Sequence, residues 1–91
     1  MKIIYKDNFV HKLEFLIEYI AKDKPKAAKR FYTVLIKSIH KIPKRPYSFR
    51  KSIYFDDDTI RDLIFKGYTI VFRISENQIE IFGLINRQEK P

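Results

Sequence analysis

The 91 residues match the size of one domain, and 45% of them are hydrophobic, which is enough apolar material for a packed core. Nineteen Lys and Arg against eleven Asp and Glu give a net charge of +8, which favours nucleic acid, an anionic membrane surface or an acidic protein as partner. The lack of cysteine excludes disulfides and thiol nucleophiles, and no apolar run suits a transmembrane helix or a signal peptide. We therefore expect one cytoplasmic domain over residues 1–91 with no membrane partner.

The start of the chain predicts a strand followed by a helix. Residues 2–5 are short, apolar and rich in β-formers, which is typical of an opening strand. Asp7 or Asn8 is expected to cap the helix by accepting hydrogen bonds from its first backbone N–H groups. The helix is predicted from one apolar stripe at helical spacing: Val10, Leu13, Leu16, Ile17 and Ile20.

A second amphipathic helix follows after the short polar connection at residues 22–24. Asp23 is the expected cap, and Pro25 is tolerated in the first turn because its missing N–H has no helical partner there. Pro43 is expected to end this helix. Its apolar stripe is Ala28, Phe31, Leu35, Ile39 and Ile42. Two helices joined this tightly predict an antiparallel hairpin.

The second half of the chain predicts strands, because its runs are rich in β-branched and aromatic residues. The short polar gaps between the runs favour hairpins, and hence an antiparallel meander. The expected strands are residues 49–55, 60–65, 68–75 and 79–87, separated by turns at 56–58, 66–67 and 76–78. The fold class is therefore α+β, with an N-terminal strand and a helical hairpin packed on one face of a small antiparallel sheet.

Two tight turns predict the register of this meander. If residues 66–67 and 76–77 are the turns, Thr69 lies opposite Ile64, and Arg73 lies opposite both Ile60 and Glu80. The helix-covered face would then carry Leu63, Phe65, Tyr68, Ile70, Phe72, Ile74, Ile79, Ile81 and Ile85. The other face, half polar and suited to receive a partner, would carry Ile64, Thr69, Val71, Arg73, Glu80, Phe82, Leu84 and Asn86. A bulge would shift the register by one and exchange these assignments.

The positive charge is concentrated in the middle of the chain. Residues 24–55 contain no acid and ten bases: Lys24, Lys26, Lys29, Arg30, Lys37, Lys41, Lys44, Arg45, Arg50 and Lys51. Interleaved aromatics (Tyr32, Tyr47 and Phe49) are compatible with a nucleic-acid surface, where bases stack on rings. The same pattern also fits a solvated helix face opposite the apolar stripe, and both interpretations stay open.

Few residues suggest catalysis. His11 and His40 stand alone on the two helices, and the acids of residues 56–58 fit a turn better than a metal site, so no metal or cofactor is expected. Arg61, Arg73 and Arg87, with Asn86, could bind phosphate groups near the strand ends. Arg73 could equally pair with Glu80, and Arg61 with Asp23 or an acid of the turn. The residues alone do not indicate an enzyme.

The assembled pattern resembles the ParE/RelE superfamily of toxins from bacterial type II toxin–antitoxin systems, over nearly the whole chain. The resemblance rests on the order of strand, two helices and meander, and on the segments FLIEYIAKDKPKAAKRFYTVLIKSIHKIPKRP, IRDLIFKGYTIVFRI and IEIFGLINRQ. The opening of the second helix, Lys24-Pro25-Lys26-Ala27-Ala28 followed by Phe31, is similar to the ParE branch in particular.

The resemblance implies a cytoplasmic toxin that is neutralised by a cognate antitoxin, in a toxin–antitoxin hetero-oligomer. ParE-like members inhibit DNA gyrase by binding, whereas RelE-like members cleave mRNA on the ribosome with basic residues of the open sheet face. Here Thr69 stands where RelE-like toxins usually carry an arginine, and Asn86-Arg87 replaces a frequent His-Arg. We therefore favour gyrase inhibition.

Two alternatives stay open: an mRNA endoribonuclease that uses Arg61, Arg73 and Arg87, and a non-toxic, basic RNA-binding family member. The residues expected to contact the antitoxin or the target are Lys29, Arg30, Arg50, Lys51, Arg61, Thr69, Arg73, Asn86 and Arg87.

Overall fold

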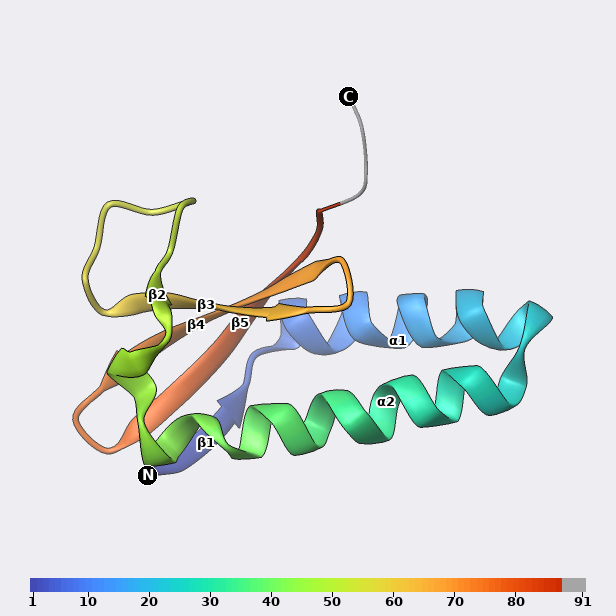
Figure 1. Cartoon of the computed structure of the whole chain (residues 1–91), viewed down its shortest axis with the longest axis horizontal. Helices are drawn as coiled ribbons and strands as arrows, with labels where there is room; N and C mark the ends of the chain where they lie inside the picture. The colour runs from blue at the N-terminus through green and yellow to red at the C-terminus, as the bar shows by residue number, and fades with distance from the viewer. Residues whose placement is uncertain (88–91) are drawn as a thin grey trace.

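The computed structural model describes residues 1–87 and shows an α+β fold, in which a helical hairpin covers one face of a five-stranded sheet (Figure 1). The predicted order of strand, two helices and meander is confirmed. No helix within the described residues is long and apolar enough to cross a membrane. The elements are β1 (Lys2–Tyr5), α1 (Asp7–Asp23), α2 (Pro25–His40), the 3-10 turns Ile42–Lys44 and Pro46–Ser48, β2 (Arg50–Lys51), β3 (Ile60–Phe65), β4 (Tyr68–Ser75) and β5 (Gln78–Asn86).

The sheet has the strand order β1-β5-β4-β3-β2 and is mixed. The strands β2 to β5 are antiparallel neighbours, whereas β1 pairs in parallel with β5, with Ile3 opposite Ile79. The expectation of an entirely antiparallel sheet is therefore wrong at this edge. Parallel neighbours need a long connection, and here the whole helical hairpin and meander lie between the two strands.

The hairpin forms from the predicted apolar stripes but not from the predicted caps. Neither helix has a side-chain hydrogen bond at its N-cap, which is Lys6 for α1 and Lys24 for α2. Asp23 is the last residue of α1, so only Lys24 separates the helices, and Pro25 takes the first position of α2 as expected. The Asn8 side-chain amide donates instead to the Phe82 carbonyl at 3.2 Å, which ties the start of α1 to β5.

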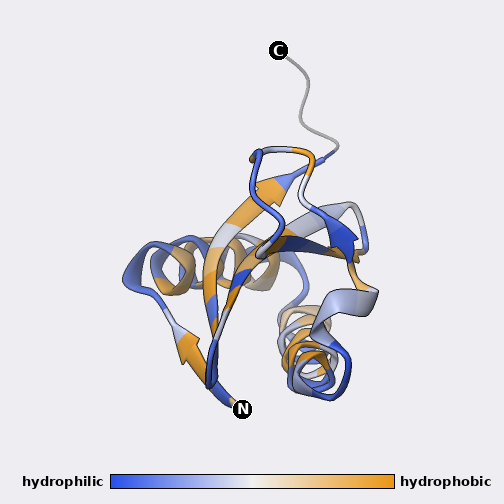
Figure 2. Cartoon of the chain, turned by 90° about the vertical axis from the view of Figure 1, so that its left-hand side faces the viewer, coloured by the Kyte–Doolittle hydropathy of each residue, from blue (hydrophilic) through white to orange (hydrophobic). Residues whose placement is uncertain are grey.

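The core lies between the hairpin and the sheet. Leu35 and Ile39 of α2 are fully buried there, as predicted, together with Phe72 and Ile81 of the sheet. In α1 the fully buried residue is Phe9, whereas the neighbouring Val10 lies at the edge of the core. Figure 2 shows the apolar residues (orange) in stretches along the strands and on both helices.

The predicted register is confirmed up to a bulge in β5. Thr69 lies opposite Ile64, and Arg73 lies opposite Ile60 and Glu80, but the pairing shifts between Val71 and Phe72. The shift exchanges the last three assignments. Leu84, with 8% of its surface exposed, and Asn86, opposite Tyr68, lie on the face that the helices cover, and Ile85, opposite Thr69, lies on the other face. Gly83 sits at the bulge because a Cβ there would lie 3.0 Å from the Cβ of Val71.

The second face of the sheet is more covered than expected. The predicted strand at residues 49–55 shortens to Arg50–Lys51, and the following loop, residues 52–59, folds so that the Phe55 ring contacts the Phe82 ring at 5.6 Å. Val71 and Thr69 on this face are buried. The loop therefore covers part of the receiving surface expected from the sequence, while Ile64 and Arg73 on the same face stay exposed.

Candidate functional site

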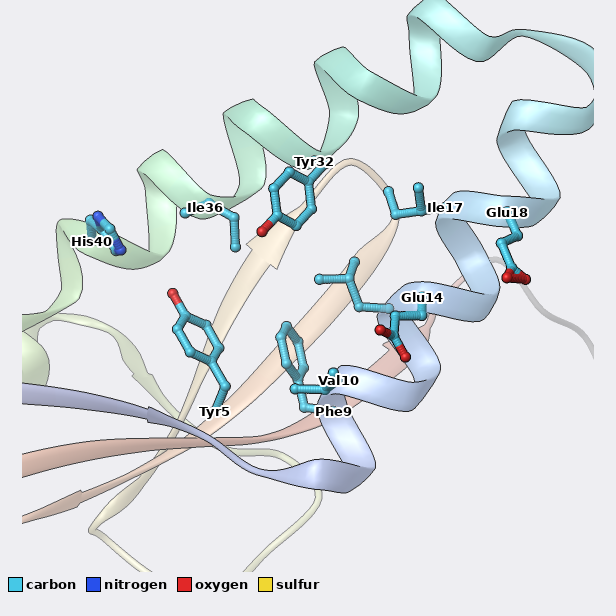
Figure 3. A pocket seen from close by; sticks show the side chains of 10 residues that line it. Tyr5, Phe9, Val10, Glu14, Ile17, Glu18, Tyr32, Ile36 and His40 are labelled. Atoms are coloured by element: carbon cyan, nitrogen blue, oxygen red, sulfur yellow. The ribbon is translucent and has the colours of Figure 1, made fainter.

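A groove runs between α1 and α2 and ends at β1 (Figure 3). Its volume is about 660 Å³, and its surface is mostly apolar with polar groups at the rim. The residues that line it are Tyr5, Phe9, Val10, Leu13, Glu14, Ile17, Glu18, Tyr32, Ile36 and His40. An apolar depression with a few polar groups is the usual form of a binding site.

The floor of the groove is preformed by core residues. Phe9 and Leu13 belong to the buried cluster, and the Tyr5 ring stacks on Phe9 at 6.0 Å between centroids. The Tyr5 hydroxyl is buried and has no hydrogen-bond partner among residues 1–87. Burial raises the pKa of this hydroxyl, and Tyr32 raises it further, so the group stays protonated and can donate a hydrogen bond. The hydroxyls of Tyr5 and Tyr32 both point into the gap between the helices (Figure 3).

The two sides of the groove carry opposite charges. Glu14 and Glu18 lie on the α1 side. On the α2 side, Lys29 precedes Tyr32, Ile36 and His40 at helical spacing and therefore shares their stripe. The helix α2 contains Lys26, Lys29, Arg30 and Lys37 and no acid. A segment with an apolar face, acids on one flank and bases on the other would complement this groove.

Among the expected contact residues, Lys29 and Arg30 are exposed on α2, but Arg50 and Lys51 are engaged within the chain. The Arg50 Nη2 lies 3.0 Å from Asp62 Oδ2, and its Nε donates to the same oxygen at 3.1 Å. The Lys51 Nζ lies 3.2 Å from an oxygen of Asp58, and this hydrogen bond raises the pKa of Lys51. These two cations are therefore less available to an anionic partner.

Arg61 holds the loops together on the helix-covered side. It pairs with Phe72 across the strands, and its guanidinium donates to the carbonyls of Asp58 at 2.8 Å, Phe49 at 3.0 Å and Tyr47 at 3.3 Å. The same guanidinium lies 4.9 Å from the centre of the Tyr47 ring. The sequence led us to expect an acid side chain as the partner of Arg61. Within the described residues its guanidinium instead binds three backbone carbonyls.

The structure does not bring the three candidate arginines together. Arg73 lies on the opposite face from Arg61, across from Glu80, with its guanidinium 5.9 Å from the centre of the Phe82 ring. Arg87 lies at the other end of β4, where its backbone N–H donates to the Gly67 carbonyl at 2.8 Å. Arg73 lies five positions along the strand from Tyr68, which is at that end, and this is a distance of roughly 17 Å.

Thr69 and Asn86 also differ in their surroundings. Thr69 is 0% exposed, so a partner cannot reach it in this conformation, whereas Asn86 lines a second groove beside α1. The described residues contain no group of three His, Asp or Glu side chains placed to hold a metal ion.

The sequence did not reveal the groove residues Tyr5, Glu14 and Glu18. The sequence did contain a sign of the groove itself: the apolar stripe of α1 includes Val10 and Ile17, which are not fully buried and line the groove. A stripe wider than the core requires indicates a partly open apolar face.

Comparison with known proteins gives one family and one fold. The family described as ParE toxin of type II toxin-antitoxin system, parDE, matches residues 3–91. A solved structure described as the chromosomal ParDE TA system from P. aeruginosa has a chain with a TM-score of 0.80 and 13% identity, which covers 94% of this chain and 95% of that one. At this identity the likeness shows the fold alone. No curated protein sequence matches the chain significantly.

Proposed function

Because the chain belongs to the ParE toxin family of type II toxin–antitoxin systems, we propose that it is the toxin of such a pair. A cognate antitoxin holds it inactive, and the released toxin inhibits DNA gyrase by binding. The observation that carries the first part is the groove between α1 and α2: a preformed apolar surface whose buried Tyr5 hydroxyl has no partner within the described residues.

The antitoxin segment would bind as an amphipathic helix or extended peptide laid into this groove. Its apolar anchors would cover the partly exposed groove residues Val10, Ile17 and Ile36. Acidic side chains on one flank would meet Lys29 of α2, and basic ones on the other would meet Glu14. A backbone carbonyl or a carboxylate of the segment would accept the hydrogen bond that Tyr5 offers. A desolvated donor that gains an acceptor adds specificity as well as affinity.

Action by binding is supported by the placement of the arginines. A phosphoryl-transfer site needs cations that converge on one phosphate, but Arg61 and Arg73 lie on opposite sheet faces and Arg87 lies at the far end of β4. Arg61 also uses its guanidinium on three backbone carbonyls. This arrangement favours gyrase binding over the alternative, ribosome-dependent cleavage of mRNA.

The antitoxin test uses the purified cognate antitoxin as the partner. Tyr32→Ala and the double variant Glu14→Lys/Glu18→Lys should each weaken its binding at least about tenfold, because one removes an aromatic contact and the other reverses the rim charge. Lys37→Glu, a charge reversal on the exposed side of α2, is the matched control and should change affinity much less. Binding that Tyr32→Ala and the Glu14→Lys/Glu18→Lys variant leave intact, or that Lys37→Glu weakens as much as they do, would show that the groove is not the site.

The target test compares two assays on the same purified toxin. Gyrase supercoiling should stop at stoichiometric toxin, while mRNA on translating ribosomes stays intact. Normal supercoiling at an excess of toxin, with cuts in mRNA that disappear on Arg87→Ala, would replace gyrase inhibition by the nuclease alternative. Growth without arrest on induction would instead support the non-toxic alternative.

A further inference from the structure

The helix α1 borders a second groove, on the side away from α2. This groove lies between α1 and the end of the sheet, and its volume is about 700 Å³. We propose that it binds single-stranded nucleic acid, with bases stacked on Phe15 and Tyr19 of α1 and phosphates held by cations around it.

The first observation is the exposure of two aromatic rings. Phe15 is 74% exposed and Tyr19 is 69% exposed, the highest values among the large hydrophobic residues that the structure describes. They follow His11 at four-residue intervals, so the three rings form a row on one side of α1 with steps of about 6 Å along its axis. Neither ring belongs to the core. Adjacent exposed apolar side chains usually mark an interaction site.

The second observation is the sign of the charge. The cation Lys12 lines the groove together with His11, and none of the lining residues is an acid. The acids of this part of α1, Glu14 and Glu18, line the other groove. Glu14 and Glu18 of α1 thus line the groove towards α2, whereas Lys12 and the aromatic rings line the groove towards the end of the sheet.

The third observation is that two further cations, Lys66 and Arg87, are neighbours in sequence of the lining residues Tyr68 and Asn86. The hydrogen bond from the Arg87 backbone N–H to the Gly67 carbonyl, 2.8 Å, fixes Arg87 beside the turn that contains Lys66. Lys66 and Arg87 are exposed and flank these lining residues in sequence.

Aromatic rings beside cations are the means by which proteins hold single strands without sequence preference. The lining of this groove contains no acid, and Asp23, four residues after Tyr19, lies beyond the end of the row. An acidic peptide would satisfy the cations as well, but it would leave the free faces of Phe15 and Tyr19 without a planar partner. The row of rings from residue 11 to 19 spans about 12 Å, which accommodates a few nucleotides. The chemistry shared by single-stranded DNA and RNA, a polyanion with planar bases, is therefore the best match.

The test measures anisotropy of labelled 12-nucleotide oligothymidylate and oligouridylate with the full-length chain, at several salt concentrations. Because the readout needs neither antitoxin nor gyrase, its result is independent of the proposed function. We expect a salt slope of about −2, equivalent to roughly three phosphates at 0.7 each. Phe15→Ala/Tyr19→Ala should weaken binding at least about 25-fold with the slope unchanged. Lys12→Ala should reduce the slope by about 0.7.

Tyr54→Ala is the matched control, since it removes an exposed aromatic ring outside this groove, and it should leave affinity unchanged. Circular dichroism verifies that each variant is folded. Tighter binding of the RNA oligomer would indicate contacts to the 2′-hydroxyl, and equal binding would indicate recognition of features common to both. Either result supports the site.

Three outcomes would overturn the proposal. The first is no binding at 50 mM salt, and the second is binding that Phe15→Ala/Tyr19→Ala leaves intact, which would reduce the interaction to general attraction by a basic chain. The third is a dimer by sedimentation that this double variant dissociates, which would assign the rings to a second copy of the chain. An acidic peptide that displaces the oligomer and loses affinity equally in the double variant would likewise reassign the groove.

Discussion

The pair formed by Arg50 and Asp62 should contribute unequally to stability, depending on which partner is removed. The Asp62 side chain is 0% exposed, whereas that of Arg50 is 41% exposed. The Asp62 Oδ2 accepts one hydrogen bond from Arg50 and another, at 3.2 Å, from the backbone N–H of Ile53. The Asp62 Oδ1 is buried and has no hydrogen-bond partner within the described part of the chain. Arg50→Ala therefore leaves a buried carboxylate with one donor, for which about 3–5 kcal/mol is the expected loss.

Asp62→Ala should cost less, because the guanidinium of Arg50 can turn to water. The main loss is the acceptor of the Ile53 N–H, which is about 1–3 kcal/mol. The double variant should be more stable than Arg50→Ala alone, since it removes the buried charge together with its partner. A domain of this size is stable by only about 5–10 kcal/mol, so Arg50→Ala removes a large part of that stability. Arg50→Lys, which keeps the charge but loses the contact through two nitrogens, provides a milder comparison.

Urea unfolding followed by circular dichroism measures these differences, since the chain contains no tryptophan. A change of 1 kcal/mol corresponds to about 4–8 °C in the thermal midpoint of a domain of this length, so the order of the variants is easily resolved. The reasoning is refuted if Asp62→Ala is as destabilising as Arg50→Ala, or if the two losses simply add in the double variant. Either result would mean that the carboxylate reaches water in spite of its position.

Three further predictions concern the sheet and its loop. Leu84→Ala should lower the free energy of unfolding by about 2–4 kcal/mol in chemical denaturation, because Leu84 packs in the core beyond the bulge; a change below 1 kcal/mol would contradict this register. Gly83→Ala should lower it by about 1–3 kcal/mol, because the new Cβ meets the Val71 Cβ at 3.0 Å, and a thermal midpoint that does not fall would show that β5 relaxes easily. The hydrogen bonds from Thr59 hold the pKa of Asp57 below its usual value. Their contribution to the free energy of unfolding is therefore fully present above the ordinary carboxyl pKa and is lost as the pH falls through the lowered pKa. Thr59→Val should therefore destabilise at pH 7, and its difference from the parent should shrink as the pH falls through the lowered pKa of Asp57; a difference that is constant with pH would contradict this linkage.

The helical hairpin and the register of the meander were predictable because both depend on local patterns. Apolar spacing identifies a helix within a few turns of chain, and two short turns fix which residues of three strands lie opposite one another. Pro25 and Pro43 marked the boundaries through the hydrogen bonds that proline cannot make. The bulge was not predictable, because it depends on the close approach of Gly83 to Val71, which belong to different strands.

The candidate site was harder to predict because a charged residue does not reveal its partner. Alternation along β3 places Arg61 on the same face as Leu63 and Phe65, and hence away from Arg73, so part of the answer was present in the sequence. The three carbonyls that Arg61 binds come from loops whose path has no periodicity. Asp62 was overlooked for the same reason, since a single acid in a strand gives no sign that it is buried beneath an arginine.

The cations that are not paired within residues 1–87 indicate from which side of the molecule an acidic partner would approach. The acid-free stretch of residues 24–55 includes Arg50 and Lys51, which are already paired with Asp62, Asp56 and Asp58. The other cations of that stretch lie on α2 or in the turns after it, so the field of the molecule is positive on the α2 side. An antitoxin segment with the acidic flank proposed above would therefore be attracted first to α2 and would reach the interhelical groove from that side. Lys12, which lines the second groove, lies outside that stretch, so the proposed nucleic-acid site does not depend on the cations of α2.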